Sequence, residues 1–498
     1  MLCGYFAASQ LFAQTDLGRL VITVTDEKKN APLPCRIHLK DAKGKPVRAE
    51  KLPFFRDHFV CTGKVQLDLT PAKYSYEIER GPEYLMRTGS VTVTAAATQH
   101  LALKLERLAD MPAEGWWSGD LHVHRPLEDI EMLMQAEDLH VAPVMTWWNA
   151  RNEWSKRKPP ADLLVQFDRN RFYHVMAGED EREGGALLYF NLKEPLLIAS
   201  AAREYPSPMK FLKEARQHSG VWVDIEKPFW WDVPVWLASG QVDSVGLANN
   251  HMCRDQMYES EAWGRPRDKQ RLPPPRGNGF WTQEIYYHIL NCGLRIPPSA
   301  GSASGVLPNP VGYDRVYVQV GPDLTYEKWW EDLRAGRSFV SNGPLLRCKA
   351  NGKWPGYVFT GKTPLEIEIE TALAARDPIS IIQIIKNGRV ERAVLFEEWK
   401  RMGKLGKVKF TESGWFLVRA IADNPKTFRF ASTAPFYVEI GDHKRLISRE
   451  SAQFFFDWVR ERIGRIKLDD ATQREEVLAY HRMAEKFWQE KVASANAP

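Results

Sequence analysis

The chain has 498 residues, of which 44% are hydrophobic and 26% charged, a mixture typical of a globular protein with two to four domains. Its net charge of +5 arises from 68 basic and 63 acidic residues. So weak a bias, without any lysine- or arginine-rich block, gives no reason to expect a nucleic-acid partner. The six cysteines form no C-x-x-C pair, which argues against a cysteine zinc site.

Residues 1–14, MLCGYFAASQLFAQ, are apolar and rich in small residues. They resemble the end of a secretory signal, although no basic segment precedes the apolar part. We therefore expect an exported protein, periplasmic or extracellular, with an ordinary chain terminus and a cytoplasmic location as the alternative. No later apolar run reaches the length of about 18 residues that a membrane span requires, so no membrane span is expected.

Residues 18–110 contain short segments that alternate apolar and polar side chains, separated by turn signals. The segments are RLVITVTD, CRIHLKD, KVQLDL, YSYEIER, GSVTVTA and QHLALKLE. Six such strands predict a small accessory β-sandwich. Cys35 and Cys61 lie within it, and the sequence leaves open whether they form a disulfide in an exported protein.

The pattern changes in residues 115–345, where short apolar strands alternate with helical segments. The strands are LHVAPVMTW, YHVMAGE, VWVDIEKP, SVGLANNH and LRIPPSAGS, and the helices include Ile130–Glu137, Pro208–His218 and Trp281–Asn291. This alternation predicts βα units and a mostly parallel sheet, open or closed into an α/β barrel. Strand patterns return in residues 346–442, which predict a second β-domain. Residues 446–498 predict a helical tail with apolar stripes.

Functional side chains of a parallel α/β domain gather at the carboxyl ends of its strands. His122 and His124 are two residues apart on an extended segment, so both imidazoles point to one side. Glu179 and His251 end later strands. Three histidines and one carboxylate predict a site for one divalent transition metal, zinc or else iron or manganese.

Neighbouring polar residues are expected to support this site. Asp120 is either an acceptor that orients an imidazole or a simple turn residue, and Asn250 adjoins His251 in the sequence. Glu226 or Asp224 would act as the general base or supply a further ligand, and the sequence does not decide between these roles. A metal at this position would acidify a bound water and supply hydroxide near neutral pH.

These segments also resemble a known family. GDLHVHR, EDLHV, the strand-end Gly178-Glu179, NNH and GRSFVSNGP are similar to the polymerase-and-histidinol-phosphatase (PHP) superfamily, and most of all to its CehA/McbA branch of carbaryl-hydrolase-like metallohydrolases. The resemblance covers residues 115–345. It implies a distorted (βα)7 barrel and a metal-dependent hydrolase of phosphoesters or, in this branch, of esters or carbamates.

The chain departs from the family pattern at three places. It has Thr146-Trp147-Trp148-Asn149 in place of Thr-Asp-His, Lys227-Pro228 in place of His-Pro, and residues 301–305, GSASG, in place of Gly-Ser-Asp-x-His. The resemblance therefore implies a reduced site with one metal. Lys227, where a ligand stood, would either stabilise an oxyanion or simply pair with Asp224 or Glu226.

The remaining candidates are expected to bind the substrate, a small molecule. They are Arg125, Trp147, Trp148, Trp231, Ser302 and Arg315. Tryptophans near the strand ends favour a flat aromatic or sugar-like substrate, although a self-packed lid would explain many of them. Exposed salt bridges are the alternative role for the two arginines.

Three functions follow as hypotheses. The first is a metal-dependent hydrolase of an ester, carbamate or phosphoester. The second is a degraded barrel that binds a carbohydrate or another ligand outside the cell, and the third is a structural or adhesive module. The sequence leaves the substrate and the oligomeric state open.

Overall fold

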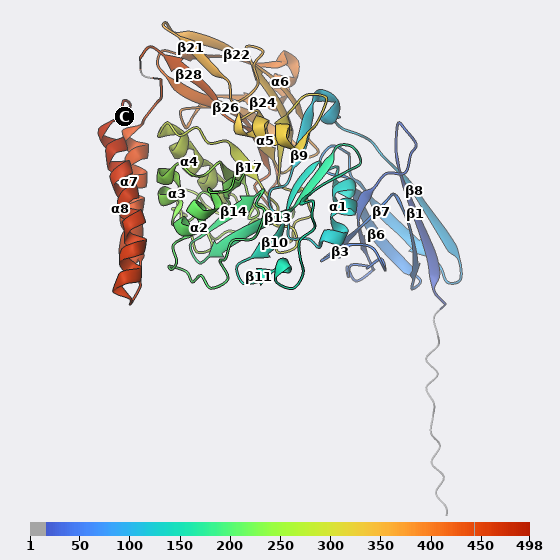
Figure 1. The fold of residues 1–498 in the computed structure, drawn as a ribbon. Coiled ribbons are helices and arrows are strands. Elements are labelled where there is room, and N and C mark those ends of the chain that lie inside the picture. Colours follow the sequence, from blue (N-terminus) through green and yellow to red (C-terminus); the bar gives the residue numbers. More distant parts are fainter. Residues whose placement is uncertain (1–15, 443) are drawn as a thin grey trace, which may run out of the picture. The chain divides into compact units, whose positions relative to one another are not determined.

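The computed structural model describes residues 16–442 and 444–498, which divide into two compact units (Figure 1). The first unit comprises residues up to 80 together with 84–107, and the second comprises 81–83 and 108–498. The predicted signal segment, residues 1–14, lies outside the described residues. Within the described part of the chain, no helix combines the length and the apolar character needed to cross a membrane.

The first unit consists of two β-sheets around one hydrophobic core. Its strands are β1 (Gly18–Asp26), β2 (Cys35–Lys40), β3 (Phe54–Phe55), β4 (His58–Cys61), β5 (Lys64–Leu69), β6 (Ala72–Glu79), β7 (Arg87–Val93) and β8 (Thr98–Leu105). The sheet orders are β5-β1-β8 and β3-β4-β2-β6-β7. All six predicted strand segments are strands, whereas β3 and β4 are too short to show a periodicity. Cys35 and Cys61 face each other across β2 and β4, with 3.9 Å between their Sγ atoms.

The second unit begins with the region that holds the candidate site. Its strands are β9 (Trp116–Gly119), β10 (Val141–Trp148), β11 (Arg151–Asn152), β12 (Leu164–Phe167), β13 (Arg171–Arg182), β14 (Gly185–Phe190), β15 (Trp222–Ile225), β16 (Ser244–Ala248), β17 (Pro298–Ala300), β18 (Arg315–Gln319) and β19 (Ser338–Ser341). Its helices are α1 (Ile130–Glu137), α2 (Pro208–Ala215), α3 (Val233–Ser239), α4 (Gly277–Asn291) and α5 (Tyr326–Arg334).

The predicted (βα)7 barrel is wrong. Repeated βα units would give parallel strands only, but in this mixed sheet β13 pairs antiparallel with β12 and β14, and β18 pairs antiparallel with β9 and β19. Strands outnumber helices over the described chain as a whole, and α1 to α5 are the α-helices that accompany the eleven strands of this region. The physical reason is clearest between β13 and β14, where Arg182 pairs with Gly185 across a loop of two residues. Gly184 adopts a φ of 125° in this loop, and so tight a hairpin leaves no room for a crossover helix.

Six of the nine C-terminal strands among the described residues continue the same sheet. The remaining elements are β20 (Leu345–Ala350), β21 (Val358–Gly361), β22 (Leu365–Ala374), β23 (Ile379–Lys386), β24 (Arg389–Leu395), α6 (Phe396–Met402), β25 (Lys404–Phe410), β26 (Gly414–Ala422), β27 (Phe430–Thr433) and β28 (Phe436–Ile440). Because β27 pairs with both β19 and β26, β21, β23, β24, β26, β27 and β28 share a sheet with the site region, whereas β20, β22 and β25 form a separate three-stranded sheet. Strands of both sheets form a second core with residues such as Trp116 and Tyr317.

A helical hairpin ends the chain: α7 (Arg449–Arg465) and α8 (Ala471–Ala493), drawn in red in Figure 1. Phe455, Trp458 and Trp488 form its buried stripe and belong to the main core. Trp488 donates its indole N–H to the carbonyl of Pro234 in α3 at 2.9 Å. The hairpin is therefore docked on the α3–α4 side of the second unit.

Candidate metal centre

The polar segments that were singled out in the sequence follow β9, β15, β16 and β17, and Glu179 lies near the end of β13. Strands β9, β10 and β13 pair in parallel, as do β15, β16 and β17. The carboxyl ends of parallel strands meet at one edge of a sheet, where ligand sites commonly form. Local parallel pairing in this mixed sheet is thus enough to bring the segments together.

His122 and His124 lie on an extended segment after β9. Val123 between them is fully buried and forms parallel bridges with Val144 and Ser304, so the two imidazoles point to the opposite side together. A glycine at 301 permits this path, because a Cβ there would lie 2.5 Å from the Cβ of His122.

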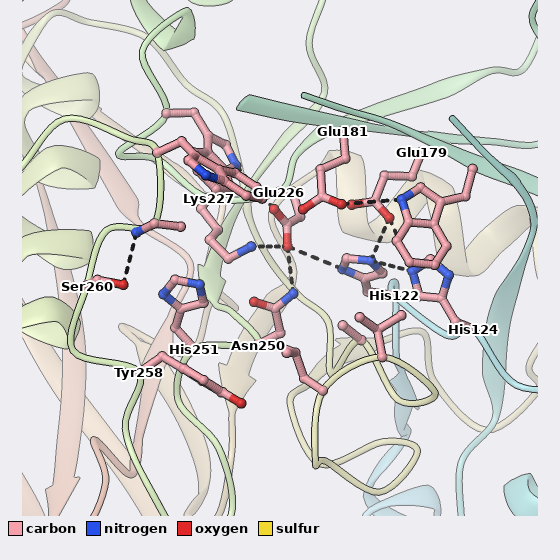
Figure 2. Close-up of a pocket in the computed structure, with 17 residues that line it drawn as sticks. His122, His124, Glu179, Glu181, Glu226, Lys227, Asn250, His251, Tyr258 and Ser260 are labelled. Carbon is pink, nitrogen blue, oxygen red and sulfur yellow. Dashed lines mark hydrogen bonds and ion pairs between the residues drawn. The ribbon is translucent and has the colours of Figure 1, made fainter. Parts of the chain in front are cut away.

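The three candidate ligand atoms of His122, His124 and Glu179 form a small triangle (Figure 2). The two Nε2 atoms are 2.9 Å apart, and Glu179 Oε2 lies 3.3 Å from that of His122 and 3.2 Å from that of His124. Ligand atoms bound at about 2 Å to one Zn²⁺ are themselves about 3 Å apart. The donor set and its spacing therefore fit one divalent cation.

The electrostatics of the triangle reflect its burial. Burial raises the pKa of Glu179, but the charges and hydrogen bonds of His122 and His124 outweigh it and hold that pKa well below its usual range. Burial lowers the pKa of His124, whereas the pKa of His122 is raised because Glu179 and Glu226 outweigh its burial. The site therefore favours an ionised Glu179, which is the carboxylate state that a cation requires, whereas a cation would have to displace the proton that the raised pKa of His122 favours.

Glu226 is the acceptor behind this triangle. It lies 3.5 Å from His122 Nδ1 through Oε1, which also accepts from Asn250 Nδ2 at 2.7 Å. Its Oε2 accepts from Trp230 Nε1 at 3.1 Å, and Lys227 Nζ forms a close ion pair with Oε1. A carboxylate behind a histidine fixes the tautomer that leaves Nε2 free to bind a metal. Of the two roles left open for Lys227, the geometry favours pairing with Glu226.

A cavity of about 210 Å³ opens beside the triangle. Its polar lining comprises His122, His124, Glu179, Glu181, Glu226 and Lys227. Its aromatic lining comprises Trp148, Trp230, Tyr258 and Trp263. Asn250, His251 and Ser260 complete one wall, and the apolar lining residues are Ala262, Ala303, Val306 and Leu307.

His251 does not join the triangle, although the sequence suggested it as the fourth ligand. Among the described residues, the ligand atoms within 4.8 Å of one another here come from His122, His124 and Glu179 alone. Figure 2 shows His251 across the pocket beside Tyr258, with Asn250 between it and His122. Its ring packs against those of Phe229 and Tyr258, both at 5.7 Å.

Three of the predicted polar residues lie beneath the site. Asp120 does not contact an imidazole, but accepts from the backbone N–H groups of His122, Ser302 and Gly312 and from the Ser302 hydroxyl. It therefore ties the His122 segment to the loop after β17. Asp224 accepts from the hydroxyls of Ser244 and Ser299, and burial raises its pKa to about 7. Neither Asp224 nor Ser302 is among the described residues that line the cavity.

The predicted substrate-binding residues separate in the structure. Trp148 lines the cavity, with its ring 4.7 Å from that of His124. Trp147 instead stacks on Tyr189, and Trp231 lies under the guanidinium of Arg465. Buried Arg125 pairs with Asp129 at 3.8 Å, and buried Arg315 donates to the carbonyls of Gly312 and Glu137. These last four are not among the described residues that line the cavity.

Glu181 and Trp263 are pocket residues that were not selected from the sequence. Glu181 lies two positions after Glu179 on β13, so the alternation that paired His122 with His124 would have found it. It accepts from Trp148 Nε1 at 3.3 Å, and burial together with the charges of Glu179 and Glu226 raises its pKa to about 7. Trp263 lies in the segment between β16 and α4, where no periodicity points to it.

A second cluster of potential ligands lies in the first unit, at His38, Asp57 and His58. There Arg36 donates to His38 Nε2 at 3.1 Å, so Nδ1 carries the proton and donates to Asp57 at 3.1 Å. His58 Nδ1 lies 3.0 Å from the other Asp57 oxygen. Ordinary hydrogen bonds therefore account for this cluster, and we assign it no metal.

No protein-family model matches the chain, and no curated protein sequence matches it significantly. Among solved structures, GBS52, a minor pilin of Streptococcus agalactiae, aligns over 19% of this chain and 46% of its own with 18% identity and a TM-score of 0.17. The TIE protein of Bacillus anthracis aligns over 86% of this chain and 51% of its own with 9% identity and a TM-score of 0.15. The chain thus matches about half the length of each, and scores this low carry no argument about fold or function.

Proposed function

We propose that the protein is a metal-dependent hydrolase that cleaves an ester, carbamate or phosphoester bond of a small molecule. The observation that carries the proposal is the triangle of His122 Nε2, His124 Nε2 and Glu179 Oε2 at the edge of a cavity. A structural zinc site is closed by four protein ligands, whereas a catalytic site has three and an open position. Three ligand atoms facing a cavity favour the catalytic kind.

The residues around the triangle would have different roles in the reaction. A cation held there would acidify a water molecule and polarise the bond to be cleaved. Glu226 keeps His122 in the ligating tautomer from behind, and Lys227 balances the buried charge of Glu226. Glu181 lines the cavity and accepts one hydrogen bond, from Trp148, which places a carboxylate where a proton could be accepted or returned.

The test is elemental analysis of the wild type beside a His122→Ala, His124→Ala double variant, after reconstitution with zinc, iron or manganese. We expect about one equivalent of metal in the wild type and none in the variant. Both proteins are then assayed on aryl esters, carbamates and phosphoesters, and hydrolysis should disappear with the metal.

A matched control replaces two histidines outside the site, His100→Ala and His218→Ala. It should retain both the metal and the hydrolysis, because neither residue lines the cavity or belongs to the ligand triangle. A wild type that takes up no metal would overturn the proposal. A wild type that takes up metal but hydrolyses none of the three substrate classes would confine the proposal to a metal site.

The similarity of the site segments to CehA/McbA-like metallohydrolases stays part of this proposal, at the level of the ligand residues and not of the barrel. Export from the cytoplasm is likewise a proposal, because it rests on residues 1–14. Processing near Ala13 or Gln14 would support it, and N-terminal sequencing of the secreted protein would detect such cleavage.

A further inference from the structure

One wall of the cavity carries two buried polar atoms that lack a hydrogen-bond partner. Asn250 Nδ2 donates to Glu226 Oε1, so its Oδ1 is the atom left to accept a hydrogen bond. Within the described residues, neither Asn250 Oδ1 nor His251 Nδ1 has a partner. The two residues are only 4% and 8% exposed, and both line the cavity. Buried polar groups are normally paired, so this wall points to a ligand that supplies the missing bonds.

Hydroxyl groups meet both needs. Each has one donor and two acceptor positions, so one hydroxyl can donate to Asn250 Oδ1 while a second pairs with His251 Nδ1 in either tautomer. A flat aromatic ring without polar substituents would leave both atoms unpaired, at a cost of about 1–3 kcal/mol for each. The polar wall therefore favours a hydroxylated ligand over a bare aromatic one.

The aromatic side chains that line the cavity suit a ligand with a ring. Trp230 and Trp263 stack with their planes 19° apart and their centroids 6.5 Å apart, and Trp263 is 48% exposed. Tyr258 lines the cavity beside His251. Flat aromatic faces can pack against the apolar face of a sugar-like ring or against an aromatic ring. The unpaired atoms of Asn250 and His251 favour the sugar-like ring, because it carries hydroxyl groups.

The charge of the cavity disfavours an anionic ligand. Glu179, Glu181 and Glu226 contribute carboxylates to its lining, and Lys227 is the one lysine or arginine among the described lining residues. Lys227 is already paired with Glu226. A divalent cation on the triangle would roughly balance the remaining negative charge, which leaves little attraction for a phosphate or carboxylate group.

We infer that the substrate is an uncharged ester of a carbohydrate, whose hydroxyls pair with Asn250 and His251 and whose ring packs on Trp230 and Trp263. This inference rests on the proposed hydrolase function. Water is the co-reactant: the acyl carbon–oxygen bond breaks, the hydroxide of water joins the acyl carbon, and the remaining proton goes to the sugar oxygen. The products are a carboxylic acid and the free sugar.

The experiment measures binding separately from turnover. Methyl glycosides of glucose, galactose, mannose and N-acetylglucosamine are titrated into the zinc-reconstituted protein by calorimetry, beside their O-methylated counterparts and toluene, an aromatic ring without polar substituents. We expect at least one glycoside to bind and its O-methylated counterpart to bind at least tenfold more weakly. Acetylated forms of the bound glycoside should also be hydrolysed faster than an aryl acetate.

Two variants locate the binding. His251→Phe keeps the ring and removes the nitrogens, so glycoside binding should weaken at least tenfold while the metal content stays at one equivalent. His218→Phe, outside the cavity, should bind like the wild type. Loss of metal in His251→Phe would show that His251 is a ligand and would overturn the inference.

The outcomes separate the two proposals. If no glycoside binds, or if toluene binds as tightly as the best glycoside, the carbohydrate inference is wrong even when aryl esters are hydrolysed. If glycosides bind through His251 but no ester is cleaved, the hydrolase proposal fails and the binding inference stands.

Discussion

His122 is the residue on which the site depends, because it makes contacts at both ends of its imidazole ring. Its Nε2 faces His124 and Glu179, and its Nδ1 faces Glu226. The carboxylate behind it therefore acts on a metal only through the histidine. Acceptors in this position typically contribute 10- to 100-fold to metal affinity.

Glu226→Gln should accordingly weaken zinc binding by about 10- to 100-fold without removing any of the three ligands. The measurement is a competition titration against a chelator of known zinc affinity. Glu183→Gln is the control, since the Glu183 side chain is 60% exposed. The zinc affinity of this variant should equal that of the wild type. Equal affinity in Glu226→Gln would show that the negative charge of Glu226 does not act on the metal through His122.

Glu181 is the carboxylate that we propose for proton transfer within the cavity. It accepts a hydrogen bond from Trp148 within the cavity, and it is not one of the three candidate ligands. Glu181→Gln should retain one equivalent of metal and lower kcat by about 10²- to 10⁴-fold, with little change in KM. A loss of metal in this variant would instead make Glu181 a ligand.

The residues that sequence reasoning could reach are those governed by local geometry. The two-residue spacing of His122 and His124 predicted a shared direction, and their Nε2 atoms indeed converge. The distance from His251 to the triangle depends on the path of the loops after β16, which no periodicity reveals. The roles of Arg315 and Trp147 could not be predicted either, because they depend on which side of a strand faces the core.

Among the elements, the α7–α8 hairpin is held by a buried charge cluster as well as by apolar contacts. Arg462 Nε lies 2.7 Å from Asp232 Oδ1, and its terminal nitrogens pair with both oxygens of Glu204. His481 Nε2 lies 3.3 Å from Asp232. Removing one member of such a buried cluster leaves the others uncompensated.

Arg462→Met should therefore destabilise the protein by about 3–5 kcal/mol. Arg460→Met in the same helix removes an exposed pair with Glu485 and a contact over the Phe456 ring, and it should cost less than about 1 kcal/mol. Urea unfolding of both variants beside the wild type gives the comparison. Equal midpoints for the two variants would contradict a stabilising role for the cluster.

The same cluster predicts a dependence of stability on pH. Burial raises the pKa of Asp232, but Arg462 and His481 outweigh it and hold that pKa well below its usual range. The unfolded value is about 3.9, so the folded state binds fewer protons and the stabilisation is present above about pH 4. It is lost as the pH falls further toward the folded pKa.

Thermal unfolding of the wild type and Asp232→Asn from pH 7 to pH 2.5 tests this dependence. The difference in Tm between them should be largest near neutral pH and should shrink as the pH falls below about 4. A difference that stays constant over the whole range would assign the effect of the substitution to packing.

Elements were predictable where burial imposes a period over many residues. Residues 130–137 were predicted as a helix and form α1, and the six predicted strands of the first unit are strands. The barrel prediction failed because it depended on connections. The hairpin at Glu183-Gly184 joins two buried strands directly, and its two glycines, Gly184 and Gly185, were the signal that was missed.

At the scale of the whole molecule, every residue that lines the candidate cavity belongs to the second unit. The first unit has its own core, in which Ile37 is fully buried. Damage to that core should therefore affect stability without affecting the metal centre. Ile225 provides a matched position, since it is equally buried and directly precedes Glu226.

Ile37→Ala should destabilise the first unit by about 2–5 kcal/mol, which hydrogen exchange would detect as faster exchange within residues 18–79. Its zinc affinity and hydrolytic kcat should match those of the wild type. Ile225→Ala removes the same atoms next to the site, so it should leave exchange in residues 18–79 unchanged and weaken zinc binding. If Ile37→Ala lowered kcat with its metal retained, the first unit would have a part in the reaction that its separate core does not suggest.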